Sequence, residues 1–165
     1  MTAAIKSREE IRLRPVSLAD ADLLFDWVNR PDSLASKLRT KGPVSRSTHD
    51  KWLAARLADP DCFIWVVERD GRPAGQVRLE GGSGEYSGKY EVDIYIDAEV
   101  RGRGSATAGL RSALTELATV RPGARAVARI RPGNQASRRL FARLGFTVVE
   151  QLSDHIVYML SLDEG

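Results

Sequence analysis

The segment from Glu91 to Ala118 restricts the possible folds more than any other part of the sequence. Its first part, 91–97, alternates polar residues with the branched apolar residues Val92, Ile94 and Ile96, a period of two that is typical of a half-buried strand. Its last part carries apolar residues at steps of three and four, which predicts an amphipathic helix that continues to Ala118. A short basic turn with glycines separates the two elements. We therefore expect a strand, a tight turn and then a long helix.

The turn between this strand and this helix has the composition of an anion-binding site. Glycine lets backbone N–H groups point toward a ligand, and the following helix has no acidic residue before Glu116. Free N–H groups at a helix N-terminus, with two arginines beside them, favour phosphate. A tight turn with solvated arginines is the alternative interpretation. The turn consists of Arg101, Gly102, Arg103, Gly104, Ser105 and Ala106.

Two common phosphate-binding motifs do not fit this turn. No Gly-Lys-Ser/Thr follows at the spacing of a Walker loop. A dinucleotide-binding fingerprint requires glycine where Thr107 stands, and an acidic residue about twenty positions later. Neither of these two motifs therefore accounts for the turn.

A second segment, from Asn134 to Phe146, predicts a short helix with defined ends. Asn134 is a favourable N-cap, Gly145 suits the position after the last helical residue, and an apolar row recurs every four residues between them. The Asn-x-x-Ser and Gly-Phe of this segment, taken with the earlier Arg-x-x-Gly-x-Ala, resemble the GNAT superfamily of acetyl-CoA-dependent N-acyltransferases. The resemblance extends over nearly the whole chain. It implies a single domain over residues 1–165 with an α/β (α+β) fold, whose mixed, mostly antiparallel sheet of about seven strands is flanked by about four helices and splayed between strands 4 and 5.

The rest of the chain supplies the elements that this fold requires. Strands are expected at 11–16, 63–68, 74–79, 126–130, 146–150 and 156–160, in addition to 91–97. Further helices are expected from Ser17 or Asp20 to Val28 and from Ser45 or Ser47 to Leu57. Arg69 to Arg72 is predicted to form a hairpin turn, because Asp-Gly tolerates two positive φ angles. Residues 33–44 and 81–88 have the least regular pattern.

Composition fits one globular domain and disfavours several other functions. An apolar content of 42% and a charged content of 28% are ordinary, and a net charge of +3 is too small to imply nucleic-acid binding. The sequence has no apolar run of about eighteen residues and no apolar leader at its start. Because Cys62 is its single cysteine, a disulfide framework is excluded. We therefore expect a cytoplasmic monomer or homodimer that needs no nucleic acid, membrane or metal.

The N-terminal part resembles two branches of the superfamily. Trp27, Asn29, His49 and Trp52 lie in patterns similar to those of enzymes that acetylate 4-amino groups of nucleotide-linked deoxysugars, although Val28 replaces an arginine of that pattern. This resemblance implies that the four residues bind the acceptor. The early Arg-Leu-Arg-Pro at residues 12–15 resembles the start of ribosomal-protein N-terminal acetyltransferases. Alternatively, the two tryptophans belong to the core and His49 is an exposed helix residue.

The resemblance also implies which residues hold acetyl-CoA, the expected co-substrate. In the family, the splayed fourth strand lends backbone groups to the pantetheine, and the following turn holds the pyrophosphate. Asn134 is expected at the pantetheine or only as a helix cap, while Arg138 and Arg139 either reach the 3′-phosphate or are solvated. The expected coenzyme contacts are Ile94, Tyr95, Ile96, the turn from Arg101 to Ala106, Asn134, Ser137, Arg139 and Phe141.

Two carboxylates on the central strand are candidates for removing the proton of the amine. Glu91 stands where many relatives carry Glu, and Asp93 lies two residues later on the same face of the strand. Either side chain could accept the proton directly or through water. A solvated strand edge or an ion pair with an arginine is the alternative. His49 is a weaker candidate for the same role.

Position 141 departs from the family pattern. Many relatives have Tyr seven residues after the motif Asn, where it protonates the coenzyme A thiolate, but Phe141 has no proton to donate. Ser137 lies four residues earlier on the same helix face and is the candidate donor. Alternatively, the thiolate takes its proton from solvent.

Three classes of function follow from these patterns. The first is an N-acetyltransferase that acts on a small primary amine, with a nucleotide-linked amino sugar as the best candidate. The second is an N-terminal acetyltransferase of proteins, which an acidic, peptide-wide groove would favour over a closed, aromatic-lined pocket. The third is a non-catalytic module, either a coenzyme A sensor or an Arg-Gly nucleic-acid binder. A single Arg-Gly turn without interleaved aromatic residues disfavours the last of these.

The Ser137→Ala variant tests the candidate proton donor. We expect the turnover rate to fall far more than the affinity for acetyl-CoA, because the hydroxyl would act on the leaving thiolate. Thiol release measures the turnover, and calorimetric titration measures the affinity. Equal turnover in the variant and the parent would remove Ser137 from the mechanism.

Overall fold

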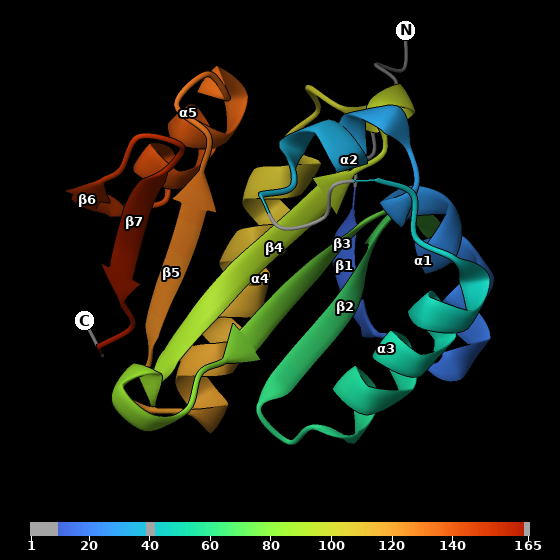
Figure 1. Cartoon of the computed structure of the whole chain (residues 1–165), viewed down its shortest axis with the longest axis horizontal. Coiled ribbons are helices and arrows are strands. Elements are labelled where there is room, and N and C mark those ends of the chain that lie inside the picture. The colour runs from blue at the N-terminus through green and yellow to red at the C-terminus, as the bar shows by residue number, and fades with distance from the viewer. Residues whose placement is uncertain (1–9, 39–41, 164–165) are drawn as a thin grey trace, which may run out of the picture.

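The computed structural model of this protein describes residues 10–38 and 42–163, which form one sheet with helices on both faces (Figure 1). The strands are β1 Ile11–Pro15, β2 Cys62–Arg69, β3 Arg72–Gly81, β4 Lys89–Ile96, β5 Arg125–Ile130, β6 Thr147–Gln151 and β7 Ile156–Ser161. The α-helices are α1 Ala21–Val28, α2 Pro31–Ser36, α3 Arg46–Ala58, α4 Ser105–Val120 and α5 Gln135–Arg143. Short 3₁₀ helices occupy Leu18–Asp20, Gly84–Tyr86 and Ala98–Val100.

The strands lie in the order β1-β2-β3-β4-β5-β7-β6. Neighbouring strands are antiparallel except for β4 and β5, which run parallel. The connection between the parallel strands passes through α4, since a parallel pair requires a long crossover. The predicted α/β fold, with a mixed and mostly antiparallel sheet, is therefore confirmed.

The parallel pair β4 and β5 separates soon after it begins, as Figure 1 shows. Its register joins Lys89 with Arg125, Tyr90 with Ala126, and Glu91 with Val127. In contrast, β3 remains paired with β4 as far as Ile96. The sheet therefore opens along the second half of β4, on the edge that faces β5. This is the splay that was predicted between strands 4 and 5.

Apolar side chains form two clusters on opposite faces of the sheet. The larger cluster packs α4 and α5 against the sheet, with Leu110 and Leu117 of α4 fully buried. The smaller cluster packs α1 and α3 against the other face and includes Trp27 and Leu53. Tyr95 of β4 packs against this second cluster. The alternation predicted for β4 thus decides which of its residues face the α1 and α3 side.

The structure adds a helix that the sequence pattern did not reveal. The first helix was expected to end at Val28 and residues 33–44 to be irregular, but Pro31 begins the short helix α2. Proline suits the first position of a helix, because its φ is already helical and its missing N–H is not needed there. Residues 39–41 of the irregular stretch lie outside the described residues.

Arg69 corrects the prediction for the hairpin between β2 and β3. It was assigned to the turn, whereas it is the last residue of β2 and is buried. The turn itself is formed by Asp70 and Gly71, whose φ angles are +50° and +79°. The Asp-Gly pattern thus predicted the turn correctly, but the burial of the arginine before it depends on a contact with a distant segment.

Replacing Gly75 by alanine is expected to destabilise the protein by about 1–3 kcal/mol, because an added Cβ would overpack the centre of the sheet. That Cβ would collide with the backbone oxygen of Tyr95 and lie 3.0 Å from the Cα of Ile96. Urea denaturation measures the free energy of unfolding. Gly133→Ala is the control, since no atom lies within 4 Å of its added Cβ. Equal stability of the two variants would contradict the expectation.

Candidate active site

The turn before α4 has the geometry that its glycines predicted. Gly102 and Gly104 adopt φ angles of +77° and +81°, which favour glycine. The N–H of Ala108 donates to the carbonyl of Gly104 at 3.0 Å, so the preceding amides point out of the helix end. Because the first turn of α4 carries no acidic residue, these amides can bind an anion. We call the residues from Arg101 to Ala106 the anion turn.

A buried arginine at the end of β2 holds the anion turn in place through hydrogen bonds. Nη1 of Arg69 donates to the carbonyl of Arg103 and to Oγ of Ser105, each at 3.1 Å. Arg69 is 7% exposed and Ser105 is 2% exposed. The Ser105 hydroxyl is therefore directed into the protein. The backbone amide of Ser105, the group that was expected to hold the pyrophosphate, is left to face a ligand.

The two arginines of the anion turn are placed differently. Nε of Arg101 donates to the carbonyl of Ile96 at 2.8 Å, its guanidinium pairs with Asp32 of α2, and it lies over the ring of Tyr95. The side chain of Arg101 thus joins the end of β4 to α2. Arg103 is exposed beside the turn, so it is the arginine with the freedom to approach a bound phosphate.

The open edge of β4 presents backbone groups of alternate residues. Asp97 donates its N–H to the carbonyl of Ala74 at 2.8 Å, which directs the odd-numbered residues of β4 toward β3. The backbone groups of Ile94 and Ile96 therefore face the space beside β5. Tyr95 was predicted to join them in binding the pantetheine, but its backbone faces β3 and its side chain faces the acceptor side.

The start of α5 confirms the cap predicted for Asn134. Its Oδ1 accepts the N–H of Ser137 at 3.2 Å. The guanidinium of Arg138 donates to the hydroxyl of Tyr158 at 3.3 Å and to the carbonyl of Pro132 at 3.0 Å, whereas Arg139 is exposed. Within residues 10–38 and 42–163, Arg139 makes no hydrogen bond or ion pair, so its side chain can turn toward the coenzyme. Its contact with the coenzyme, like those of Asn134 and Ser137, stays a prediction.

Phe141 belongs to the core. Its side chain is 3% exposed, and its ring meets that of Phe146 edge-on with the ring centroids 5.0 Å apart. It therefore stabilises α5 against the sheet. Its predicted contact with the coenzyme stays a prediction.

A cavity of about 830 Å³ opens on the face of the sheet that α1 and α3 cover, and it continues to β5. Aromatic residues from several elements line it. They are Trp27 of α1, His49 and Trp52 of α3, Tyr86 of the loop before β4, and Tyr95 of β4. Three of the four residues predicted to bind the acceptor thus line one cavity.

Asn29, the fourth of these residues, holds the chain after α2 in place. Its Nδ2 donates to the carbonyl of Val44 at 3.0 Å, and its Oδ1 accepts the N–H of Val44 at 2.7 Å. These two bonds occupy both ends of its side-chain amide. The structure therefore gives Asn29 a different role from the predicted contact with the acceptor.

His49 is buried, so the alternative of an exposed helix residue is wrong. Its ring lies 5.6 Å from those of Phe25 and Trp52, measured between centroids, and its side chain is 3% exposed. Burial lowers the pKa of His49 below its ordinary value of 6.5. The imidazole is therefore neutral at neutral pH.

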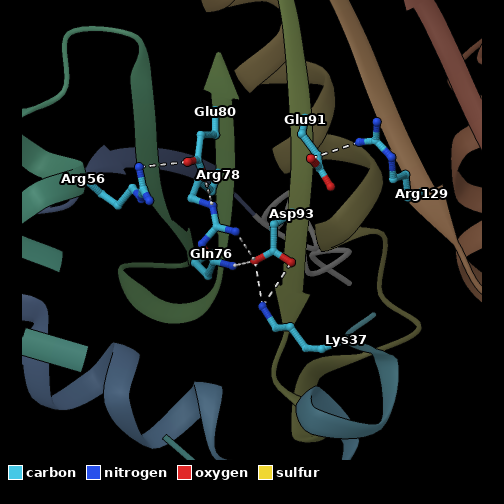
Figure 2. Close-up of polar contacts among 8 residues, drawn as sticks. All are labelled: Lys37, Arg56, Gln76, Arg78, Glu80, Glu91, Asp93 and Arg129. Atoms are coloured by element: carbon cyan, nitrogen blue, oxygen red, sulfur yellow. Dashed lines mark hydrogen bonds and ion pairs between the residues drawn. The ribbon is translucent and has the colours of Figure 1, made fainter. Parts of the chain in front are cut away.

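Charged residues from three strands meet on the floor of the cavity (Figure 2). Asp93 of β4 is at the centre of one group. Its carboxylate accepts from Nζ of Lys37 at 3.1 and 3.2 Å and from Nε2 of Gln76 at 2.9 Å, and it lies 4.0 Å from Nη2 of Arg78. Burial acts to raise the pKa of Asp93, but the nearby positive charges of Lys37 and Arg78 outweigh burial and lower it. Asp93 is therefore ionised at neutral pH.

Two further carboxylates of the floor lie directly opposite each other. Glu80 of β3 pairs in register with Glu91 of β4, and like charges at such positions repel. Arg56 lies 2.9 Å from Glu80, and Arg129 of β5 lies 3.0 Å from Glu91. Figure 2 shows these arginines on opposite sides of the pair. The two guanidinium groups thus compensate the repulsion.

The sequence pattern did not reveal that β3 contributes to this site. Gln76, Arg78 and Glu80 alternate with the buried residues Val77 and Leu79. The period of two had predicted the strand, and it also marked these three residues as one polar face. Their place in the cavity could not be inferred, because a solvated strand face has the same pattern.

Comparison with known families identifies the chain. The model of the acetyltransferase (GNAT) domain matches residues 10–147. The protein belongs to the GNAT acetyltransferase family. No curated protein sequence matches the chain.

Several solved structures share the fold of this acetyltransferase. The spermidine N-acetyltransferase of Vibrio cholerae, in complex with CoA and spermine, has a TM-score of 0.82 and 18% identity, covering 92% of this chain and 95% of that chain. An aminoglycoside acetyltransferase with coenzyme A has a TM-score of 0.76 and 20% identity, covering 92% and 95%. A ribosomal-protein α-N-acetyltransferase with CoA has a TM-score of 0.77 and 18% identity, covering 93% and 94%. Such low identities establish the fold alone.

The co-substrate of this GNAT acetyltransferase is acetyl-CoA. The anion turn offers backbone amides suited to a pyrophosphate, and the open edge of β4 offers backbone groups suited to the amides of pantetheine. Within 10–38 and 42–163, no group of three or more His, Cys, Asp or Glu residues could hold a metal ion. In the same ranges, no helix has the length and apolar character to cross a membrane.

Arg69→Met tests the support of the anion turn. We expect the KM for acetyl-CoA to rise about 10-fold, because the variant loses hydrogen bonds from a buried charged group, while kcat changes less. Steady-state kinetics at saturating amine measure both constants. Arg72→Met, at an exposed position in the same hairpin, is the control. An unchanged KM in a folded Arg69 variant, judged by its circular dichroism, would contradict the supporting role.

Proposed function

We propose that this acetyltransferase moves the acetyl group of acetyl-CoA to a primary amine of a small molecule, by direct attack in a ternary complex. The supporting observation is the position of β4 between two sites. One face of β4 carries Glu91 and Asp93 into the cavity, and its open edge leads to the anion turn. An amine in the cavity can therefore approach a thioester that lies along β4.

The cavity supports a small acceptor. Its volume of about 830 Å³ lies within the ordinary range for small-molecule sites, about 300–1,000 Å³. Its wall is aromatic, and its carboxylates are paired with cations, whereas an acidic, peptide-wide groove would favour a protein N-terminus. A nucleotide-linked amino sugar remains the best candidate, because it combines rings that stack on aromatic residues with a primary amine. N-terminal acetylation of a ribosomal-type protein is the second candidate.

Two polar atoms of the cavity wall also support ligand binding there. Nδ1 of His49 and the hydroxyl oxygen of Tyr95 are buried and, within the part of the chain that the structure describes, have no hydrogen-bond partner. Buried polar atoms are nearly always hydrogen-bonded in folded proteins. Both residues line the cavity, so a polar acceptor such as a sugar suits it better than a purely apolar ligand.

The two carboxylates of β4 are proposed to have different roles. Asp93 is surrounded by Lys37, Gln76 and Arg78, and its lowered pKa makes it a weak base. We assign to Asp93 the orientation of the amine through a hydrogen bond. Glu91 lies where β5 begins to separate from β4, and we assign to it the acceptance of the amine proton, directly or through water.

Each atom then has a defined destination. The amine nitrogen bonds to the carbonyl carbon of the thioester, the carbon–sulfur bond breaks, and sulfur leaves as a thiolate. The nitrogen proton passes to Glu91. Ser137 remains the proposed donor to the thiolate and takes a proton from water in return, since Phe141 is enclosed in the core and has no acidic proton.

Glu91→Gln tests the proposed base. We expect kcat/KM for the amine to fall about 100-fold at pH 7, with the affinity for acetyl-CoA unchanged. The loss should shrink as the pH approaches the pKa of the free amine, because the neutral form is then already present. Thiol release is followed with 4-amino-sugar nucleotides, N-terminal peptides and simple amines as acceptors, and Glu116→Gln, exposed on α4, is the control.

Two results would contradict the proposal. Full activity of Glu91→Gln at pH 7 would remove Glu91 from the role of base. Saturable binding of acetyl-CoA without thiol release for any amine would indicate a coenzyme sensor instead of an enzyme.

A further inference from the structure

Cations outnumber carboxylates among the described residues that line the acceptor cavity. The cations are Lys37, Arg78, Lys89 and Arg129, and the carboxylates are Glu80, Glu91 and Asp93. His49 adds no charge at neutral pH, because burial lowers its pKa. Arg56 approaches Glu80 from outside the lining and adds a further positive charge. The described wall of the cavity is therefore net positive.

Each carboxylate of the cavity already contacts a cation of the protein. Asp93 pairs with Lys37 at 3.1 Å, Glu80 with Arg56 at 2.9 Å, and Glu91 with Arg129 at 3.0 Å. An acceptor with several ammonium groups would have to displace these cations or lie beside them. Like charges within a few ångströms disfavour each other strongly in a partly desolvated site. The cavity is thus poorly suited to a polycation.

Two of the cations have capacity for a further partner. Arg129 contacts Glu91 through Nη1, and a guanidinium has five N–H donors in a planar fork. Its side chain is 28% exposed and lines the cavity. Lys89 lies two residues before Glu91 on the same face of β4, with Nζ 5.6 Å from the centre of the Tyr86 ring. Arg129 and Lys89 therefore flank Glu91 on the cavity wall.

We propose that the acceptor carries an anionic group, a phosphate or a carboxylate, which Arg129 and Lys89 bind while Glu91 faces the amine. This inference rests on the proposed function and narrows its substrate class. A nucleotide-linked amino sugar belongs to this class through its diphosphate, and so do amino acids and amino phosphonates. Polyamines and aminoglycosides lie outside it.

The same cations assist the chemistry of the amine. Only the neutral amine attacks a thioester, and nearby positive charge disfavours the ammonium form. The anionic group offsets the repulsion that would otherwise keep an amine away from the cavity. An acceptor with one amine and one anion is thus attracted as a whole, while its nitrogen loses a proton more readily.

Matched acceptors test the proposed anion preference. In one set, about four atoms separate the amine nitrogen from the nearest polar atom of the second group. This set consists of 3-aminopropylphosphonate, 4-aminobutanoate, 4-aminobutanamide and 1,4-diaminobutane. The other set pairs a nucleotide-linked 4-amino-deoxysugar with the same sugar lacking the nucleotide. We expect kcat/KM for thiol release to be at least about 10-fold higher for the anionic members, because each gains charge-assisted hydrogen bonds.

Variants of Arg129 and Lys89 test whether these two residues cause the preference for anionic acceptors. Arg129→Gln and Lys89→Gln should each raise the KM of the anionic acceptors about 10-fold and change that of the uncharged acceptors little. The comparison with uncharged acceptors separates the loss of anion binding from any effect of Arg129 on Glu91. Arg125→Gln is the matched control, because Arg125 lies on the same strand and is exposed outside the cavity.

Three results would overturn the inference. Faster thiol release with 1,4-diaminobutane or 4-aminobutanamide than with the anionic acceptors would contradict it and leave the proposed function intact. An equal rise in KM for charged and uncharged acceptors in the Arg129 and Lys89 variants would show that these residues do not bind the anionic group. Thiol release with none of the amines, despite binding of acetyl-CoA, would reject the proposed function itself.

Discussion

The separation of β4 from β5 is the constraint on which the rest of the structure depends. Backbone groups of a strand inside a sheet are normally taken by its neighbours, but here the register with β5 ends at Glu91 and Val127. The open edge beyond Glu91 is compatible with folding only where another group satisfies it. Arg101 satisfies the carbonyl of Ile96, and the remaining groups are suited to the amides of pantetheine. The opening in the sheet is thus the proposed site of the coenzyme.

Two arginines connect the anion turn and the start of α5 to α2, which borders the cavity. Arg101 leaves the anion turn to pair with Asp32 of α2, and Nη2 of Arg131, in the connection to α5, donates to the carbonyl of Lys37 at 2.7 Å. Lys37 in turn contacts Asp93 on the floor of the cavity. A change in the position of α2 would therefore reach both sites.

The electrostatics of the cavity follow from the sheet register. Pairing β3 with β4 places Glu80 opposite Glu91 and Arg78 opposite Asp93. Two facing carboxylates need compensating cations, which α3 and β5 supply as Arg56 and Arg129. The charge of the cavity floor is thus set by alternate residues of neighbouring strands and not by the anion turn.

The sequence by itself determined the strand, turn and helix from Glu91 onward, because local periodicity and the φ preference of glycine carry that information. The family and the co-substrate followed from the resemblance of two motifs, Arg-x-x-Gly-x-Ala and Asn-x-x-Ser, to the GNAT superfamily. It did not determine the roles of Arg69, Asn29 or the polar face of β3, because each depends on a contact with a segment far along the chain. His49 shows the same limit, since its helix pattern allowed either exposure or burial. Only tertiary packing could decide these cases, because burial and charge pairing are properties of neighbours in space.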